Sequence, residues 1–143
     1  GVILADLPAD EAEPYLAAAH RTGLGMVLFA APTTDTRRMA MVSEADAAFI
    51  YAVAEIGVTG ERLEASSNLE SLARTIRAET DRPIVFGVGI STPDHARAAA
   101  RHGDGVIVGT AIVRRVLEAS DVETAAATLV GTVRGFAEAM HRQ

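Results

Sequence analysis

The sequence contains no cysteine and no tryptophan, and aromatic residues make up only 4% of its 143 positions. The absence of cysteine excludes disulfide frameworks, thiolate zinc sites, iron–sulfur clusters and cysteine nucleophiles. No uncharged apolar run approaches the roughly 18 residues of a membrane span. No basic segment followed by an apolar one marks a signal peptide. These absences predict a soluble, cytoplasmic globular protein.

Basic charge is also scarce, with 13 Lys+Arg against 19 Asp+Glu and a formal net charge of -6. The basic residues are scattered, and only short pairs such as Arg37-Arg38 and Arg114-Arg115 occur. Nucleic-acid binding needs basic residues gathered on one face, so the composition argues against it. His-x-His pairs, His-Glu-x-x-His and clustered carboxylates are missing, so we expect no metal site.

Short apolar runs alternate with longer amphipathic stretches along the chain. The runs are continuous rather than alternating, which indicates strands covered on both faces, as in a parallel sheet. Helices between the strands predict an α/β fold of five βα units, with residues 1–143 in a single domain. The strands are expected at 2–5, 26–30, 49–53, 84–88 and 105–108. The helices are expected at 10–21, 35–42, 68–79, 93–102, 111–119 and 122–141, with 57–67 as the longest loop.

Two architectures fit five βα units. A flavodoxin-like open sheet uses five strands and about this many residues. A (β/α)8 TIM barrel uses eight units and about 250 residues. The chain opens on a strand-like run, Gly1–Asp6, without an initiator Met, and its glycines cluster after the last two strands. Both features favour the carboxy-terminal part of a barrel, cut from a longer chain.

Glycines follow the last two predicted strands, as Gly87-Val88-Gly89 and as Gly109-Thr110. Glycine lets backbone N–H groups approach an anion closely, and a helix N-terminus adds a favourable dipole. Gly57-Val58-Thr59-Gly60, in the longest loop, offers further donors. Each motif alone is also compatible with a simple tight turn, but together they predict an anion site, and phosphate sites are common at these loops of barrels.

Other candidate residues each have a structural alternative. Asp6, at the end of the first strand, is either catalytic or a structural cap or ion-pair partner. Tyr51, in the third strand, either reaches a ligand or is a core tyrosine, and Phe29 either walls an apolar pocket or is core. We expect all four histidines on helix faces, far from the strand ends: His20, His95, His102 and His141. No catalytic pair is visible.

The motifs, taken in order, resemble the tryptophan synthase α subunit. The resemblance covers essentially all 143 residues, but only strands four to eight of that family's (β/α)8 barrel. Gly-Val-Thr-Gly followed by Gly-x-Gly-Ile-Ser at this separation is the most distinctive part. The motifs are Asp6-Leu7-Pro8, Ala31-Pro32-Thr33-Thr34, Gly57-Val58-Thr59-Gly60, Gly87-Val88-Gly89-Ile90-Ser91 and Gly109-Thr110-Ala111-Ile112-Val113.

The resemblance implies a lyase of tryptophan biosynthesis that cleaves indole-3-glycerol phosphate to indole and glyceraldehyde 3-phosphate. Indole would pass through a tunnel to a pyridoxal-phosphate β subunit in an αββα complex, and no cofactor is implied for the α subunit itself. The implied phosphate donors are Gly60, Gly89, Gly109 and Thr110. Tyr51, Phe29 and Val88 would line the substrate pocket, Thr59 would meet a catalytic aspartate, and Asp6 and Pro8 would lie near the pocket and the β-subunit face.

The sequence departs from the family at two places. Val88 stands where the family usually has phenylalanine, which implies a smaller wall of the indole pocket. Ala54-Glu55-Ile56 replaces more usual polar or basic residues before Gly57, which implies an altered mobile loop.

The family's catalytic glutamate and aspartate, on and after strand two, have no counterpart in this chain. Retro-aldol cleavage requires protonation of indole C3 and removal of the proton from the glycerol C3′ hydroxyl, which is work for positioned carboxylates. We therefore expect the chain alone to be inactive. Two alternatives remain: another phosphosugar-binding barrel enzyme, and a non-catalytic half-barrel that binds phosphate or dimerises through open strand edges.

Overall fold

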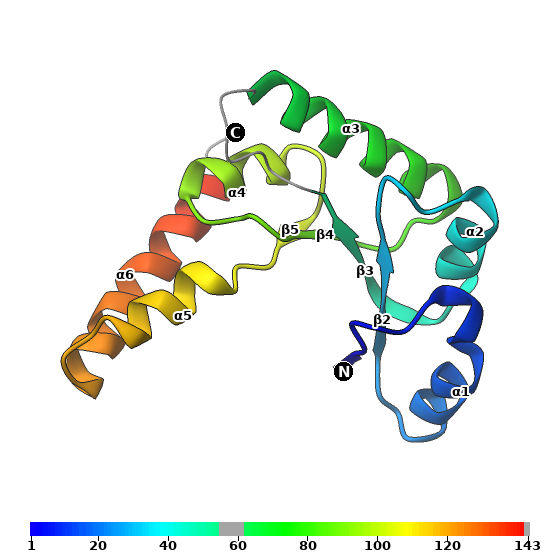
Figure 1. Cartoon of the computed structure of the whole chain (residues 1–143), viewed down its shortest axis with the longest axis horizontal. Coiled ribbons are helices and arrows are strands. Elements are labelled where there is room, and N and C mark those ends of the chain that lie inside the picture. The colour runs from blue at the N-terminus through cyan, green and yellow to red at the C-terminus, as the bar shows by residue number, and fades with distance from the viewer. Residues whose placement is uncertain (55–61, 142–143) are drawn as a thin grey trace.

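The computed structural model of the chain describes residues 1–54 and 62–141, with the side chains of 62–66 outside that description. Five parallel strands form one sheet, with helices between them (Figure 1). The predicted α/β class with five βα units is confirmed. The elements are β1 Val2–Ile3, the 3-10 helix η1 Ala9–Glu11, α1 Glu13–Arg21, β2 Met26–Ala30, α2 Thr36–Glu44, β3 Ala47–Val53, α3 Arg62–Glu79, β4 Ile84–Gly87, α4 Pro93–Ala100, β5 Gly105–Val106, α5 Thr110–Leu117 and α6 Val122–His141.

The strand order decides between the two predicted architectures. The order in the sheet is β1-β2-β3-β4-β5, and every neighbouring pair is parallel. Because crossovers between parallel strands are right-handed, a sequence of steps in one direction places every connecting helix on the same face. Figure 1 shows these helices as an arc around the outside of the strands. A flavodoxin-like sheet would reverse direction, in the order 2-1-3-4-5, so the chain carries part of a barrel wall.

The hydrophobic core lies between the sheet and this outer layer of helices. Ile50 of β3 and Ile84 and Phe86 of β4 are completely buried against the helices. Two residues of α3 are also completely buried, Leu69 and Ile76. They lie seven residues apart, on the same inner face of the helix. Burial of each large apolar side chain stabilises the fold by about 1.5–3 kcal/mol, so the central strands are the most firmly held.

Two helices begin at residues other than those predicted. The helix expected from Asp10 is a 3-10 turn followed by α1, which begins at Glu13. Pro14 lacks an N–H and fits only the first helical turn, so it sets that start. The helix expected from Asn68 already begins at Arg62, because the segment 62–65 consists of strong helix formers and the serines that follow are tolerated within a helix.

The two edge strands are shorter than predicted. β1 ends at Ile3 and β5 at Val106, so each has two residues. β1 pairs only with β2, and β5 only with β4. A strand with one neighbour has half the ladder hydrogen bonds of a central strand, so its ends are held less well.

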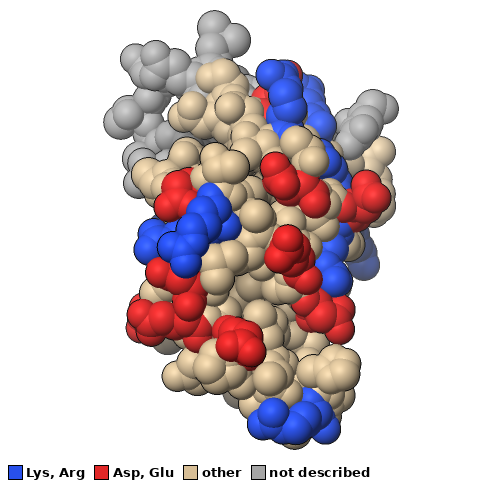
Figure 2. Space-filling model, turned by 90° about the vertical axis from the view of Figure 1, so that its right-hand side faces the viewer, with Lys and Arg blue, Asp and Glu red and all other residues tan. Residues whose placement is uncertain are grey.

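Charged side chains are mixed on the molecular surface. Figure 2 shows the face over α1 and α2, where arginines and carboxylates alternate without a continuous basic patch. Arg38 of α2 pairs there with Asp10, with 3.0 Å between its Nε and the carboxylate. In the described part of the chain, no helix is long and apolar enough to cross a membrane.

An aspartate ties β4 to the loop before β5, at the edge where the strands begin. We call this edge the amino edge, and the opposite one the carboxyl edge. Asp104 accepts a hydrogen bond from the Ile84 N–H at 2.7 Å and pairs with Arg77 of α3. Partial burial raises the pKa of the Asp104 carboxyl, but the Ile84 N–H and the Arg77 guanidinium together lower it further, so the net pKa is below its ordinary value.

Substitution Asp104→Asn tests this tie. A carboxyl whose pKa is lower in the folded chain stabilises it above the unfolded pKa of about 3.9, and this contribution is lost as the pH falls through the folded value. We expect the variant to be less stable at pH 7 by about 1 kcal/mol and to lose less stability on acidification than the parent. Urea unfolding at pH 7 and pH 3 measures both. Asp81→Asn removes a charge from the same edge as the control, and equal effects of the two substitutions would contradict the assignment.

Candidate functional site

Two aromatic side chains lie side by side on the concave face of the sheet. The ring centroids of Phe29 and Tyr51 are 4.9 Å apart, and the ring planes are inclined by 29°. The two residues are in register on β2 and β3. Their neighbours Ala30 and Ala52 are completely buried toward the helices, so the alternation along the strands directs both rings to the opposite face.

The Tyr51 ring extends over Gly87, at the end of β4. A Cβ at Gly87 would lie 2.0 Å from Cε2 and 2.1 Å from the hydroxyl oxygen of Tyr51. Real carbon atoms never approach so closely, so only glycine permits this position of the ring. Phe29, Tyr51 and Gly87 thus form a continuous surface across three strands, which we call the aromatic floor.

The chain turns sharply where it leaves the aromatic floor. Val88 has φ 68° and Gly89 has φ 78°, and both are exposed. Val88 is the only non-glycine residue with positive φ among the described residues. This left-handed conformation costs an L-residue about 1–2 kcal/mol. Within residues 1–54 and 62–141, no acceptor for the Gly89 N–H is found.

Two helices begin beside this turn. Thr92 caps α4 and accepts a hydrogen bond from the His95 N–H at 3.2 Å. α5 begins at Thr110, which is exposed and follows Gly109. A hollow of about 430 Å³ lies between α4, α5 and α6. Ser91, Pro93, Ala111 and Arg115 line it together with six residues of α6. The first turns of α4 and α5 thus lie near each other at the carboxyl edge, and the free N–H groups and dipole of a helix N-terminus favour an anion.

The comparisons with known proteins decide the family. The sequence model described as "Tryptophan synthase alpha chain" matches residues 1–141. The chain belongs to the tryptophan synthase alpha chain family. It is 44% identical over 119 residues to the alpha chain of Thermosynechococcus vestitus, which covers 82% of this chain and 45% of that one. It is 39% identical to the Streptomyces coelicolor alpha chain, over 96% of this chain and 53% of that one.

Solved structures agree with this family. The chain superposes on Mycobacterium tuberculosis tryptophan synthase with a TM-score of 0.81 and 31% identity, covering 100% of this chain and 52% of that one. The alpha subunit from Legionella pneumophila gives a TM-score of 0.79 at 26% identity, with 99% and 52% covered. The chain spans about half the length of the curated relatives it matches, and its five βα units are part of a (β/α)8 TIM barrel.

The residues that the resemblance to tryptophan synthase alpha chains singles out fall into three groups. Phe29, Tyr51 and Val88 lie at or beside the aromatic floor, and Gly89, Gly109 and Thr110 lie at the two helix N-termini. Asp6 and Pro8 are exposed in the turn after β1. Both the catalytic and the structural role of Asp6 stay predictions. Thr59 and Gly60 lie outside the described residues, as do Glu55 and Ile56.

One histidine does not lie where the sequence predicted. His95 was expected far from the strand ends, but it lies at the carboxyl edge, with its Nδ1 3.1 Å from the Gly89 carbonyl oxygen. The sequence did contain a signal for this position: His95 follows the Thr92 cap by three residues, and a side chain at that helix position reaches back toward the cap. Among the described residues, no group of three His, Asp or Glu could hold a metal.

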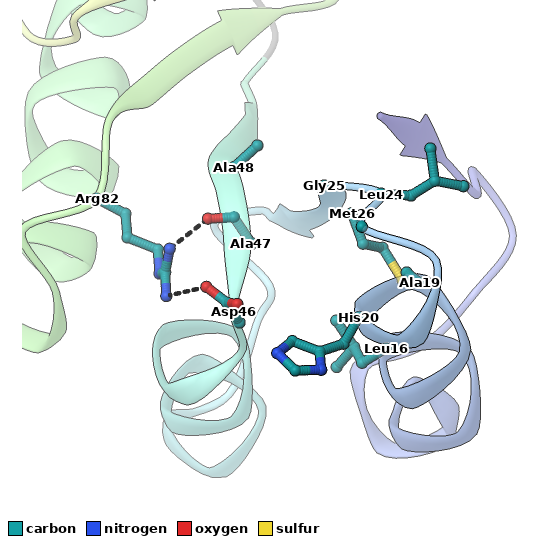
Figure 3. A pocket seen from close by; sticks show the side chains of 11 residues that line it. Leu16, Ala19, His20, Leu24, Gly25, Met26, Asp46, Ala47, Ala48 and Arg82 are labelled. Atoms are coloured by element: carbon teal, nitrogen blue, oxygen red, sulfur yellow. Dashed lines mark hydrogen bonds and ion pairs between the residues drawn. The ribbon is translucent and has the colours of Figure 1, made fainter.

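A second hollow lies at the amino edge, remote from the aromatic floor. Figure 3 shows Arg82 reaching to Asp46 and to the Ala47 carbonyl, with His20 of α1 at the rim. The Arg82 Nη2 lies 3.1 Å from the Asp46 carboxylate, and a second guanidinium nitrogen donates to Ala47. The positive charge of Arg82 is thus paired with the Asp46 carboxylate within the protein. In barrels this edge serves stability, whereas active sites lie at the carboxyl edge.

Substitution Val88→Gly tests the strained turn. Glycine adopts positive φ without the steric cost, which exceeds the added entropy of the unfolded chain. We expect the free energy of unfolding to rise by about 1 kcal/mol, measured by urea denaturation. Val85→Gly, in the extended strand β4, is the matched control and should destabilise the chain. A loss of stability in Val88→Gly as large as in the control would show that Val88 is not strained.

Proposed function

We propose that this chain supplies the phosphate-binding part of a tryptophan synthase alpha chain, the lyase that cleaves indole-3-glycerol phosphate to indole and glyceraldehyde 3-phosphate. One observation carries the proposal: the aromatic floor ends at Gly87, where β4 and the neighbouring parallel strand β5 lead through glycine-containing turns into the N-termini of α4 and α5 at the same edge of the sheet. An indole ring needs a flat apolar surface, and a phosphate needs converging N–H donors. Family membership supports the same substrate.

In this proposal the described donors are the N–H groups of Gly89 and Gly109 and the N–H and hydroxyl of Thr110. Gly60 would add a fourth donor. Tyr51 and Phe29 would contact the indole ring, with Val88 at its edge. The smaller Val88 side chain would leave more room there than the phenylalanine usual in the family.

The cleavage itself requires groups that the 143 residues do not supply. The bond between indole C3 and the glycerol carbon breaks as C3 gains a proton and the C3′ hydroxyl loses one, yielding indole and the aldehyde. The family's glutamate and aspartate for these transfers lie in the preceding barrel units. Residues 1–143 would then be the carboxy-terminal part of one barrel domain, and Thr59 would meet that aspartate.

The proposal extends to a protein partner. We expect a tryptophan synthase β subunit to receive the indole in an αββα complex, with Asp6 and Pro8 near its face. The alpha chain would need no cofactor, and the reaction would take place in the cytoplasm.

An activity assay tests the proposed reaction. We expect the purified 143-residue chain to release no indole from indole-3-glycerol phosphate above a no-protein control. Co-expression with the three amino-terminal βα units of the Streptomyces coelicolor relative should restore indole formation, because it supplies the carboxylates. Cleavage by the chain alone would show that its own residues suffice. A folded complex without activity would argue against the proposed substrate.

Substitution Thr110→Val tests the phosphate donors in the active complex. The loss of one hydroxyl hydrogen bond to a charged group costs about 1.5–3 kcal/mol, so KM should rise at least tenfold while kcat changes little. Thr36→Val, at the first residue of α2, is the matched control because it makes the same change at another helix start. An unchanged KM in Thr110→Val would remove Thr110 from the site.

A further inference from the structure

His95 connects the first turn of α4 to the Val88–Gly89 turn. The half-buried imidazole places Nδ1 3.1 Å from the Gly89 carbonyl oxygen and 3.3 Å from the Ser91 hydroxyl. The same nitrogen lies 3.5 Å from the Ser91 backbone nitrogen. All three partners belong to the segment that leads from β4 into α4.

These contacts decide whether Nδ1 carries a hydrogen. A carbonyl oxygen only accepts, so the contact with Gly89 requires a hydrogen on Nδ1, whereas a bond from the Ser91 N–H requires a bare Nδ1. One nitrogen cannot satisfy both. The 3.1 Å contact lies within the usual range for N–H···O bonds and the 3.5 Å contact lies beyond the usual hydrogen-bond range. The Nδ1–H therefore donates to Gly89, with the Ser91 hydroxyl as a second acceptor.

We infer that His95 is a positioning residue: by donating from Nδ1 to the Gly89 carbonyl, it holds the Val88–Gly89 turn so that the Gly89 N–H faces the substrate phosphate. The inference rests on the phosphate site proposed above. A strained backbone persists only where its surroundings hold it in place, and the turn includes the left-handed Val88. The bond fixes the Gly89–Ile90 peptide plane, to which the carbonyl belongs. The Gly89 N–H lies in the preceding plane, so its direction relative to α4 is restricted through the φ and ψ of Gly89.

Three variants of the 143-residue chain separate this role from a general packing role. In His95→Asn, an amide N–H can stand near the place of Nδ1, whereas in His95→Gln the amide stands near the place of Nε2. His20→Asn removes a histidine at the amino edge and serves as the control. Each nitrogen-15-labelled chain is titrated with inorganic phosphate, with the Gly89 amide signal as the NMR readout and thermal melting as the check of folding.

We expect His95→Gln to weaken phosphate binding by about fivefold to tenfold, the value of one hydrogen bond. His95→Asn and His20→Asn should stay within about twofold of the parent. Long-range proton–nitrogen spectra of the parent chain should show the neutral ring protonated on Nδ1, and this readout needs no variant.

Two kinds of result would overturn the inference, and only the second would also contradict the proposed phosphate site. Phosphate binding that is equal in all chains, or a ring protonated on Nε2, removes the role of His95 and leaves the proposed function in place. A parent chain that folds and binds no phosphate removes both the donor site and the role of His95.

Discussion

The contact between the Tyr51 ring and the bare backbone of Gly87 controls the shape of the concave face. A single Cβ at position 87 would overlap the ring, which would have to leave the sheet surface and its stacking with Phe29. The ring also lies just before the point where the chain turns at Val88. Because Gly87 has no side chain, the flat apolar surface of Phe29 and Tyr51 extends up to the turn at Val88 and Gly89.

The two edges of the sheet are built from different interactions because all strands run in one direction. At the amino edge, arginines pair with carboxylates and carbonyls, as Arg82 does with Asp46 and Ala47. At the carboxyl edge, the contacts next to the Val88–Gly89 turn are made by the Thr92 hydroxyl and by His95, whereas beside β2 Arg38 pairs with Asp10 and the Asp35 carboxylate caps α2. The Thr92 hydroxyl adds no charge of its own beside the turn, which suits the anion site proposed there.

The local sequence predicted most of the fold and part of the site. Apolar runs located the strands, and the glycines after β4 and β5 located the two helix starts, because these signals act over a few residues. The start of α3 was missed since Ser66 and Asn68 are as compatible with a helix interior as with a cap. The closeness of Tyr51 to Gly87 arises from packing between strands that are distant in sequence, and the positive φ of Val88 was missed because valine gives no sequence signal for that conformation. His95 was missed because its role depends on where the preceding turn brings a carbonyl oxygen.

The contrast between the two edges has a consequence for the effect of ionic strength. Exposed ion pairs of the amino edge, such as Arg82–Asp46 and Arg77–Asp104, are screened over about 8 Å at physiological salt and more strongly above it. Hydrogen bonds to a threonine hydroxyl or to a backbone carbonyl oxygen are hardly affected. Concentrated salt would therefore loosen the amino edge of the sheet more than the Val88–Gly89 turn, so the two ends of the same strands would differ in their tolerance of a saline environment.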